Sequence, residues 1–151
     1  KAPGFGKLDT NVALARFCNN FSSMLASGVP ILQALDIVGS TSGNYVIDSS
    51  SKRVGRLVER GYRLADSMST EKIFPNMLVQ MVSIGEDSGA IDKMLSSAGR
   101  AYDEEAQSMA KQLTSLLEPL MILFLGVVVG FMVVALYMPM FSMFDAINGQ
   151  A

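Results

Sequence analysis

The sequence of 151 residues contains no histidine and one cysteine, Cys18. A single cysteine excludes an intramolecular disulfide bond. Without histidine, neither a Ser-His triad nor a Cys-His nucleophile can form, and the usual zinc ligand sets are incomplete. Cys18 lies close in sequence to Phe17 and Phe21, so we interpret it as a buried thiol in a hydrophobic core.

Motifs for phosphate binding and acid–base catalysis are also missing. Gly85-x-x-x-Gly89 lacks the Gly-Lys-Ser/Thr end that a Walker loop requires. Asp103, Glu104 and Glu105 are consecutive, so on a helix they point in different directions and do not converge on one site. We therefore expect no cofactor, no metal and no enzymatic activity.

Charge is scarce and unevenly distributed. The net charge is −2, which gives no strong attraction to nucleic acid. All 12 basic residues and 13 of the 14 acidic residues lie at or before Glu118, and only Asp145 follows it. The 22 residues from Leu120 to Phe141 carry no charge. As a helix they would be about 33 Å long, enough to cross a hydrocarbon core of roughly 30 Å, so we predict a polar part followed by one span in membrane lipid.

Basic residues near this span predict its orientation. Lys111 lies nine residues before Leu120, whereas the tail after Phe141 has no lysine or arginine. Since basic residues favour the cytoplasmic side, the polar part should be cytoplasmic and the tail outside.

The polar part shows helical periodicity throughout. Leu14, Cys18, Phe21 and Leu25 form one stripe of a first helix, and glycines or prolines separate the segments that follow. Asn44 is a candidate N-cap for a third helix. We predict an all-α fold, an antiparallel six-helix cytoplasmic bundle whose last helix, starting at Ile91, continues into one transmembrane helix.

The domain boundaries follow from these patterns. Residues 1–9 are predicted to be a linker, because Pro3, Gly4 and Gly6 break regular structure. The cytoplasmic helical domain should cover residues 10–118, the transmembrane helix residues 119–141, and a short non-cytoplasmic tail residues 142–151. Glu118 and Pro119 form the predicted joint at membrane entry, and Pro139 should end or bend the helix.

Three groups of residues are candidate contact sites. Arg53, Arg56, Arg60 and Arg63 recur at helical spacing, which is typical of a solvated face or of a surface for an acidic partner or anionic lipid. Glu86 lies in the stretch 85–89, which is either a helix corner or an acidic contact point. Gly126 and Gly130 form a small-xxx-small pattern that lets another span approach closely, although chance explains such a pattern equally well.

With these stretches placed, the sequence resembles the inner-membrane platform proteins of type IV pilus and type II secretion machines. The resemblance covers nearly the whole chain. It rests on Ala15-Arg16-Phe17, Leu25 to Leu35, Phe74-Pro75, Gln80-Met81, Gly85 to Gly89, Tyr102 to Glu105, Leu117-Glu118-Pro119, Gly126 to Gly130 and Leu136 to Phe141.

This resemblance implies a non-enzymatic role in a bacterial inner membrane. The family carries two copies of a six-helix cytoplasmic domain and three membrane helices, so the chain would be the C-terminal half, with the second copy and the last span. The implied partners are a hexameric cytoplasmic assembly ATPase, pilin or pseudopilin subunits, other inner-membrane machine components, and further copies in a homo-oligomer, with a dimer favoured. A platform for type IV pilus assembly is the first hypothesis. The alternatives are the platform of a type II secretion system or competence pseudopilus, and a passive membrane-anchored scaffold or binding domain.

Overall fold

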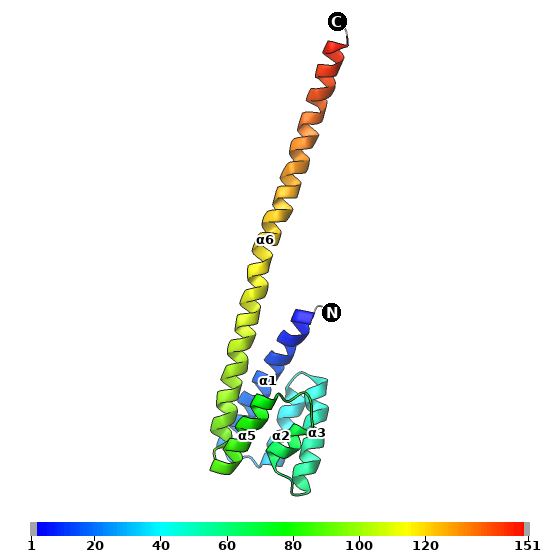
Figure 1. Ribbon diagram of the computed structural model, residues 1–151. Helices are drawn as coiled ribbons and strands as arrows, with labels where there is room; N and C mark the ends of the chain where they lie inside the picture. The colour runs from blue at the N-terminus through cyan, green and yellow to red at the C-terminus, as the bar shows by residue number, and fades with distance from the viewer. Residues whose placement is uncertain (1–2, 150–151) are drawn as a thin grey trace. The chain divides into compact units, whose positions relative to one another are not determined.

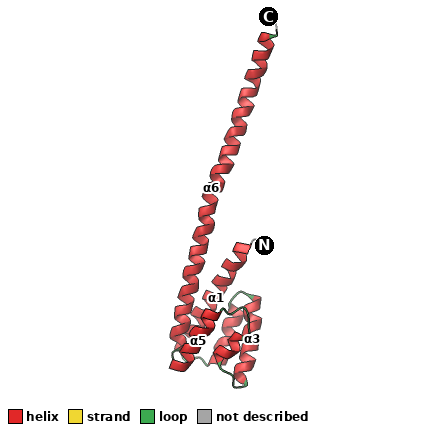
Figure 2. Ribbon diagram, in the orientation of Figure 1, coloured by secondary structure: helices red, strands yellow, loops and turns green. Residues whose placement is uncertain are grey.

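The computed structural model describes residues 3–149, and the regular structure in that range is entirely α-helical (Figures 1 and 2). The predicted all-α class is therefore confirmed. The six helices are α1 (Pro3–Ala26), α2 (Ile31–Thr41), α3 (Tyr45–Glu59), α4 (Leu64–Ser69), α5 (Asn76–Ser88) and α6 (Ile91–Asn148).

The chain divides into two compact units, which are described separately. Unit 1 ends at Met109 and contains α1 to α5 with the beginning of α6. Unit 2 begins at Ala110 and contains the rest of α6. In unit 1, α2 packs against both α1 and α3, and α4 packs against both α3 and α5.

The core of unit 1 is built from the apolar stripes of its helices. Leu14, Cys18 and Phe21 on the predicted α1 stripe are fully buried, and Leu25 at its end is half-buried. The ring of Phe17 lies 5.6 Å from that of Phe21 and 5.3 Å from that of Phe74, measured between centroids. The core also includes apolar side chains from the other five helices, among them Leu35, Val38, Ile47, Val54, Leu64, Met68, Leu78, Val82, Leu95 and Ala98.

Small residues allow the helices to approach closely at two places. A Cβ atom added at Gly39 of α2 would lie 2.7 Å from the Cβ of Ser51 on α3. A Cβ added at Gly99 of α6 would collide with the side-chain amide of Asn19 on α1. The same Asn19 donates from Nδ2 to Asp103 Oδ2 at 3.0 Å, so this part of α6 is held in register against α1.

Several predicted helix ends are confirmed. The side chain of Asn44 accepts from the backbone N–H groups of Val46 and Ile47 at 2.9 and 3.2 Å, so it caps α3. The chain turns after α3 at Gly61, whose φ of +99° favours glycine. After this turn comes the short helix α4.

The prediction of irregular structure over residues 1–9 is wrong for residues 3–9, which belong to α1; residues 1–2 lie outside the described range. Proline in the first turn of a helix costs little, because its missing N–H would have no partner there. Glycines such as Gly4 and Gly6 cost about 1 kcal/mol each relative to alanine. Contacts with the rest of unit 1 oppose this cost: Leu8 is half-buried, and Lys7 Nζ lies 4.0 Å from Glu105 Oε1.

Pro139 does not end α6, which continues to Asn148. A proline inside a helix removes one backbone hydrogen bond but leaves the bonds on either side in place. Membrane helices tolerate this interruption. Residues 142–148, predicted as a tail, are thus helical.

Tyr102 provides a test of the core. Its side chain is 3% exposed, its hydroxyl has no hydrogen-bond partner among residues 3–149, and burial raises its pKa. A buried hydroxyl without a partner is destabilising, so Tyr102→Phe should raise the free energy of unfolding by about 1 kcal/mol. Phe17→Ala is the control, and it should lower that free energy by about 3–5 kcal/mol.

The measurement is denaturant unfolding of the detergent-solubilised chain. The extent of labelling of the Cys18 thiol reports the unfolded fraction at each denaturant concentration. Cys18 is fully buried, and burial raises its pKa to about 12, so it reacts only when unit 1 opens. A lower stability of Tyr102→Phe would show that the hydroxyl has a stabilising partner.

Candidate functional site

The predicted basic stripe is divided between two elements. Arg53 and Arg56 lie on α3, Arg60 is the residue that caps its C-terminus, and Arg63 lies beyond Gly61 as the N-cap residue of α4. The four arginines therefore do not form one continuous helical face, because the turn at Gly61 interrupts the periodicity. All four are exposed, but their surroundings differ.

Arg53 is bound within unit 1. Its Nε donates to Glu71 Oε1 at 2.7 Å and its Nη2 donates to Glu71 Oε2 at 2.9 Å, a two-pronged ion pair. Ser50 Oγ donates to Glu71 Oε2 at 3.0 Å. The hydrogen bond from Arg53, followed by that from Ser50, lowers the pKa of Glu71 against the opposing effect of burial. This network connects α3 to the segment between α4 and α5.

Arg63 and Glu86 are also engaged within unit 1. Arg63 Nη2 donates to Asp87 Oδ1 at 2.6 Å. The carboxylate of Glu86 accepts from the backbone N–H groups of Leu64 at 3.0 Å and Ala65 at 2.6 Å. The side chain of the N-cap residue Arg63 makes no capping hydrogen bond to α4. Glu86 supplies the anionic cap at the start of this helix instead.

The corner that was one of two interpretations of residues 85–89 is confined to the end of this stretch. Helix α5 continues through Glu86 and Asp87 to Ser88, and the chain turns only at Gly89, whose φ is +73°. Two carboxylates in the last turn of a helix are unfavourable by themselves. Here the N-terminus of α4 and the guanidinium of Arg63 compensate for them.

Arg56 and Arg60 remain as available cations of the predicted set. Within residues 3–149, neither side chain takes part in a hydrogen bond or ion pair. Arg56 borders a groove of about 410 Å³ between α2 and α3, beside the partly exposed side chain of Leu32. Gly55 contributes no side chain to this groove. Lys52 lines the groove as a second cation and Asp36 and Glu59 line it as anions, whereas Arg60 is not among its lining residues.

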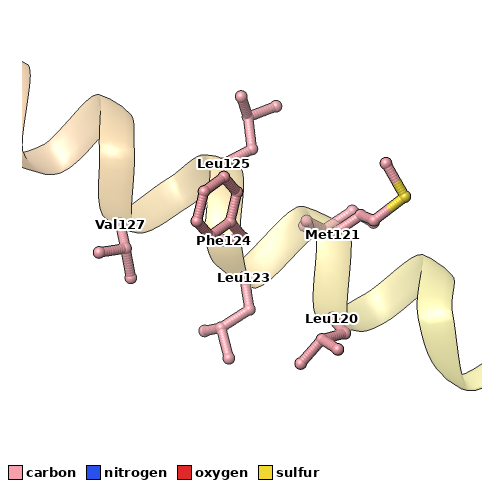
Figure 3. A pocket seen from close by; sticks show the side chains of 7 residues that line it. Leu120, Met121, Leu123, Phe124, Leu125 and Val127 are labelled. Atoms are coloured by element: carbon pink, nitrogen blue, oxygen red, sulfur yellow. The ribbon is translucent and has the colours of Figure 1, made fainter.

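Unit 2 presents apolar side chains around the helix. In α6 the most apolar 18-residue window has a mean hydropathy of 2.8, and the helix is long and apolar enough to cross a membrane. Figure 3 shows the side chains of Leu120 to Val127 pointing away from the helix in several directions, with carbon and one sulfur as their only elements. Pro119 lies inside the helix, directly before this stretch.

Gly126 and Gly130 lie four residues apart, within the apolar run. A Cβ atom at either position would meet nothing within 4 Å among the described residues. The space beside them is therefore open to lipid or to another helix.

No group of three metal-ligating side chains comes together within residues 3–149. The candidate surfaces are Arg56 with Arg60 at the C-terminal end of α3, and the apolar part of α6 that follows Pro119. The partners of Arg53 and Arg63 were missed from the sequence. Glu71 is 18 residues from Arg53 and Asp87 is 24 from Arg63, so no helical periodicity connects either pair.

Known proteins resemble the chain over most of its length. The family model described as "Type II secretion system (T2SS), protein F" matches residues 17–139. The type IV pilus assembly protein PilC of Pseudomonas aeruginosa is 40% identical over 148 residues, which are 98% of this chain and 40% of that protein. PilC of Myxococcus xanthus is 39% identical over 146 residues, which are 97% of this chain and 35% of that protein.

A secretion protein is similar at a lower level. The type II secretion system protein F of Pseudomonas aeruginosa is 30% identical over 143 residues, which are 95% of this chain and 35% of that protein. The chain thus spans between 35% and 40% of the length of these relatives.

The Arg53–Glu71 pair generates a pH prediction. Because the pKa of Glu71 is lowered in the folded chain, its pairing stabilises the fold above the ordinary glutamate pKa of 4.5. That stabilisation is lost as the pH falls below 4.5 through the folded pKa. Glu71→Gln should therefore be less stable than the parent at pH 7, and the difference should shrink as the pH is lowered towards 3.

Glu59→Gln is the matched control, since Glu59 is exposed and makes no side-chain hydrogen bond within residues 3–149. Thermal unfolding in detergent, at several pH values, measures the difference between each variant and the parent. A Glu71→Gln difference that does not depend on pH would contradict the proposed role of the ion pair.

Proposed function

Because the chain belongs to the family described as type II secretion system protein F, we propose that it is part of the inner-membrane platform of a type IV pilus assembly machine. The observation that carries this proposal is the similarity to pilus assembly proteins, which is higher than that to the secretion protein over nearly the same residues. The platform couples a hexameric cytoplasmic assembly ATPase to pilin extraction and filament assembly. It performs no reaction of its own.

The proposed location is the bacterial inner membrane. Residues 10–118 form the second copy of the family's cytoplasmic domain, residues 119–141 span the bilayer, and residues 142–151 lie on the periplasmic side. Lys111 before the span and the absence of basic residues after it support this orientation.

Helix α6 is the proposed mechanical element. It includes core residues of unit 1, such as Leu95 and Tyr102, and also the apolar run after Pro119. A helix transmits displacement along its axis, whereas a flexible segment does not, and Pro119 removes only one backbone hydrogen bond at the joint. Glu118 and Pro119 are the joint through which movement of the bundle would reach the span.

Flexibility at this joint should abolish function. Seven residues of glycine and serine inserted before Glu118 should stop piliation, although the protein should still accumulate in the membrane. Seven residues of a helix-forming sequence inserted at the same place are the control, and they should retain part of the activity. Pilus assembly in cells that depend on this protein is measured by counting surface pili.

Normal piliation with the glycine insertion would favour the alternative in which the chain is a passive scaffold or binding domain. That alternative also predicts that the bundle functions when fused to an unrelated span. For the kind of machine, the alternative is the platform of a type II secretion system or competence pseudopilus, since the secretion relative is 30% identical.

The proposed ATPase contact is the pair Arg56 and Arg60. Arg56 borders the groove between α2 and α3, and Arg60 follows four residues later at the C-terminus of α3. Of the five candidate contact residues, Arg53, Arg63 and Glu86 already have partners in unit 1. Arg56→Glu with Arg60→Glu should reduce co-purification of the ATPase by about tenfold or more, because charge reversal at a contact replaces attraction with repulsion. Arg100→Glu is the control, an exposed arginine on α6. Equal co-purification of both variants at moderate salt would rule out this surface.

Gly126 and Gly130 are proposed to pack against another span, either of a second protomer or of another component of the machine. Replacing both by leucine would keep the backbones apart and should weaken the homo-oligomer, with a dimer as the form expected. Val127→Leu with Val129→Leu is the control at the same depth. The mass of the complex in mild detergent distinguishes the two, and an unchanged mass for the glycine variant would contradict the packing role.

A further inference from the structure

Helix α6 has a backbone acceptor inside its apolar run that the helix leaves unpaired. Proline has no N–H group, so Pro139 cannot donate to the carbonyl group four residues earlier, which belongs to Ala135. The helix is a regular α-helix from Ile91 to Asn148, so no local turn of another type pairs this carbonyl again. The hydroxyl of Ser142 donates to Met138 O at 3.2 Å, and no side chain among residues 3–149 donates to Ala135 O.

Ala135 lies in a part of the chain where water would be scarce in a bilayer. It is six residues before Phe141, the last residue of the charge-free run, so it is about 9 Å from that end of the run. An unpaired backbone group in hydrocarbon is strongly unfavourable. The carbonyl freed by Pro119, that of Ser115, differs because it lies before the apolar run, where water can donate to it. A donor from another span is therefore favoured at Ala135.

Tyr137 supplies a hydrogen-bond donor at nearly the same depth. Its side chain is 54% exposed, and its hydroxyl makes no hydrogen bond within residues 3–149. It lies four residues before Phe141, about 6 Å from the end of the run. Long side chains on a helix lean towards its N-terminus, so this hydroxyl is directed towards the interior of the run and away from the nearer end.

The helix keeps this donor and this acceptor on opposite faces. At about 100° per residue, Tyr137 lies about 200° around the axis from Ala135, so the two groups cannot meet within one chain. Tyr137 follows Gly126 by 11 residues and Gly130 by seven, which places all three on one face. We call these three residues the glycine–tyrosine face, and Ala135 with Pro139 the carbonyl face.

From this complementarity we propose that the glycine–tyrosine face of one copy of the chain packs against the carbonyl face of a second copy, with the hydroxyl of Tyr137 donating to the carbonyl of Ala135. Copies inserted in the same orientation present both groups at the same depth. The two glycines and the small side chain of Ala135 allow the backbones to approach closely. The contact is head-to-tail, so in a pair one such hydrogen bond forms, and the remaining donor and acceptor are free for a further span.

The proposal requires that the apolar run crosses a bilayer. It rests on the packing role proposed above for Gly126 and Gly130, and it adds the face that these glycines contact and the hydrogen bond that selects this face. Coupling to an ATPase and pilus assembly are not required for it.

The first test is a double-mutant cycle on the association of whole chains in phosphatidylcholine liposomes. Tyr137→Phe removes only the hydroxyl, whereas Pro139→Ala restores the N–H that pairs with the carbonyl of Ala135. Association is measured by energy transfer between donor-labelled and acceptor-labelled copies over a range of protein-to-lipid ratios. The labels are attached at Glu59→Cys, because Glu59 is exposed and the native Cys18 is buried.

Tyr137→Phe should weaken association by about threefold or more, as expected for a hydrogen bond between spans. In the Pro139→Ala background the same change should have no further effect, because the acceptor is already paired within its own helix. Tyr62→Phe is the control at an exposed tyrosine of unit 1, and it should leave association unchanged. An equal loss from Tyr137→Phe in both backgrounds, or no loss in either, would overturn the proposal, since the hydroxyl would then bind lipid or water.

Cysteine cross-linking identifies which faces meet. Val133→Cys lies on the glycine–tyrosine face, seven residues after Gly126, and Ala135→Cys lies on the carbonyl face and keeps the backbone carbonyl. The two variants carry different affinity tags, are mixed in the same liposomes and are oxidised with copper phenanthroline. The disulfide that joins residue 133 of one copy to residue 135 of another should be the main product.

A main product that joins Val133→Cys to itself would show that two glycine–tyrosine faces meet. That result would overturn the head-to-tail contact and leave the packing role of the glycines intact. The absence of every cross-link, at a protein density where energy transfer occurs, would overturn both.

Discussion

The requirement that a backbone satisfy its own hydrogen bonds underlies this structure. Helix α6 contributes to a protein core at Leu95 and Tyr102 and carries no charged side chain from Leu120 to Phe141. Away from Pro119 and Pro139, the interior N–H and C=O groups of this helix are paired within the same segment, so its backbone is suited to water, protein and lipid alike. Side chains alone then decide which environment each stretch enters. The fold of unit 1 depends on the helical start of α6, because α1 packs against the part of α6 that carries Gly99.

Helical periodicity and capping chemistry predicted most of the architecture. The stripe Leu14, Cys18 and Phe21 is buried, and Asn44 caps α3, since both signals act over a few residues and need no distant partner. The errors occurred at residues 3–9 and at Pro139, where glycine and proline suggested an interruption. Their intrinsic cost is about 1–3 kcal/mol per residue, and packing or an apolar surrounding can exceed it.

The partners of the charged residues were less predictable. Spacing along a helix identifies which residues share a face, but not which side chains from other segments lie against that face. Arg53 and Arg56 look equivalent in the sequence, yet one binds Glu71 and the other borders a groove. The acids that bind Arg53 and Arg63 come from distant segments, and only the packing of α3, α4 and α5 brings them close. A charged face could therefore be assigned to a helix from the sequence, but the neighbours of its individual side chains could not.

The cap that Glu86 provides makes α4 and the end of α5 a single cooperative unit. A helix of six residues is far too short to persist alone, and the first turn of α4 lacks a cap from its own chain segment. Its backbone donors are held by a carboxylate 21 and 22 residues away. Fraying of the last turn of α5 would release both donors, so the two segments should exchange their amide protons together, as one foldon. Any partner that displaced Glu86 would remove this cap, and so weaken α4, without touching α4 itself.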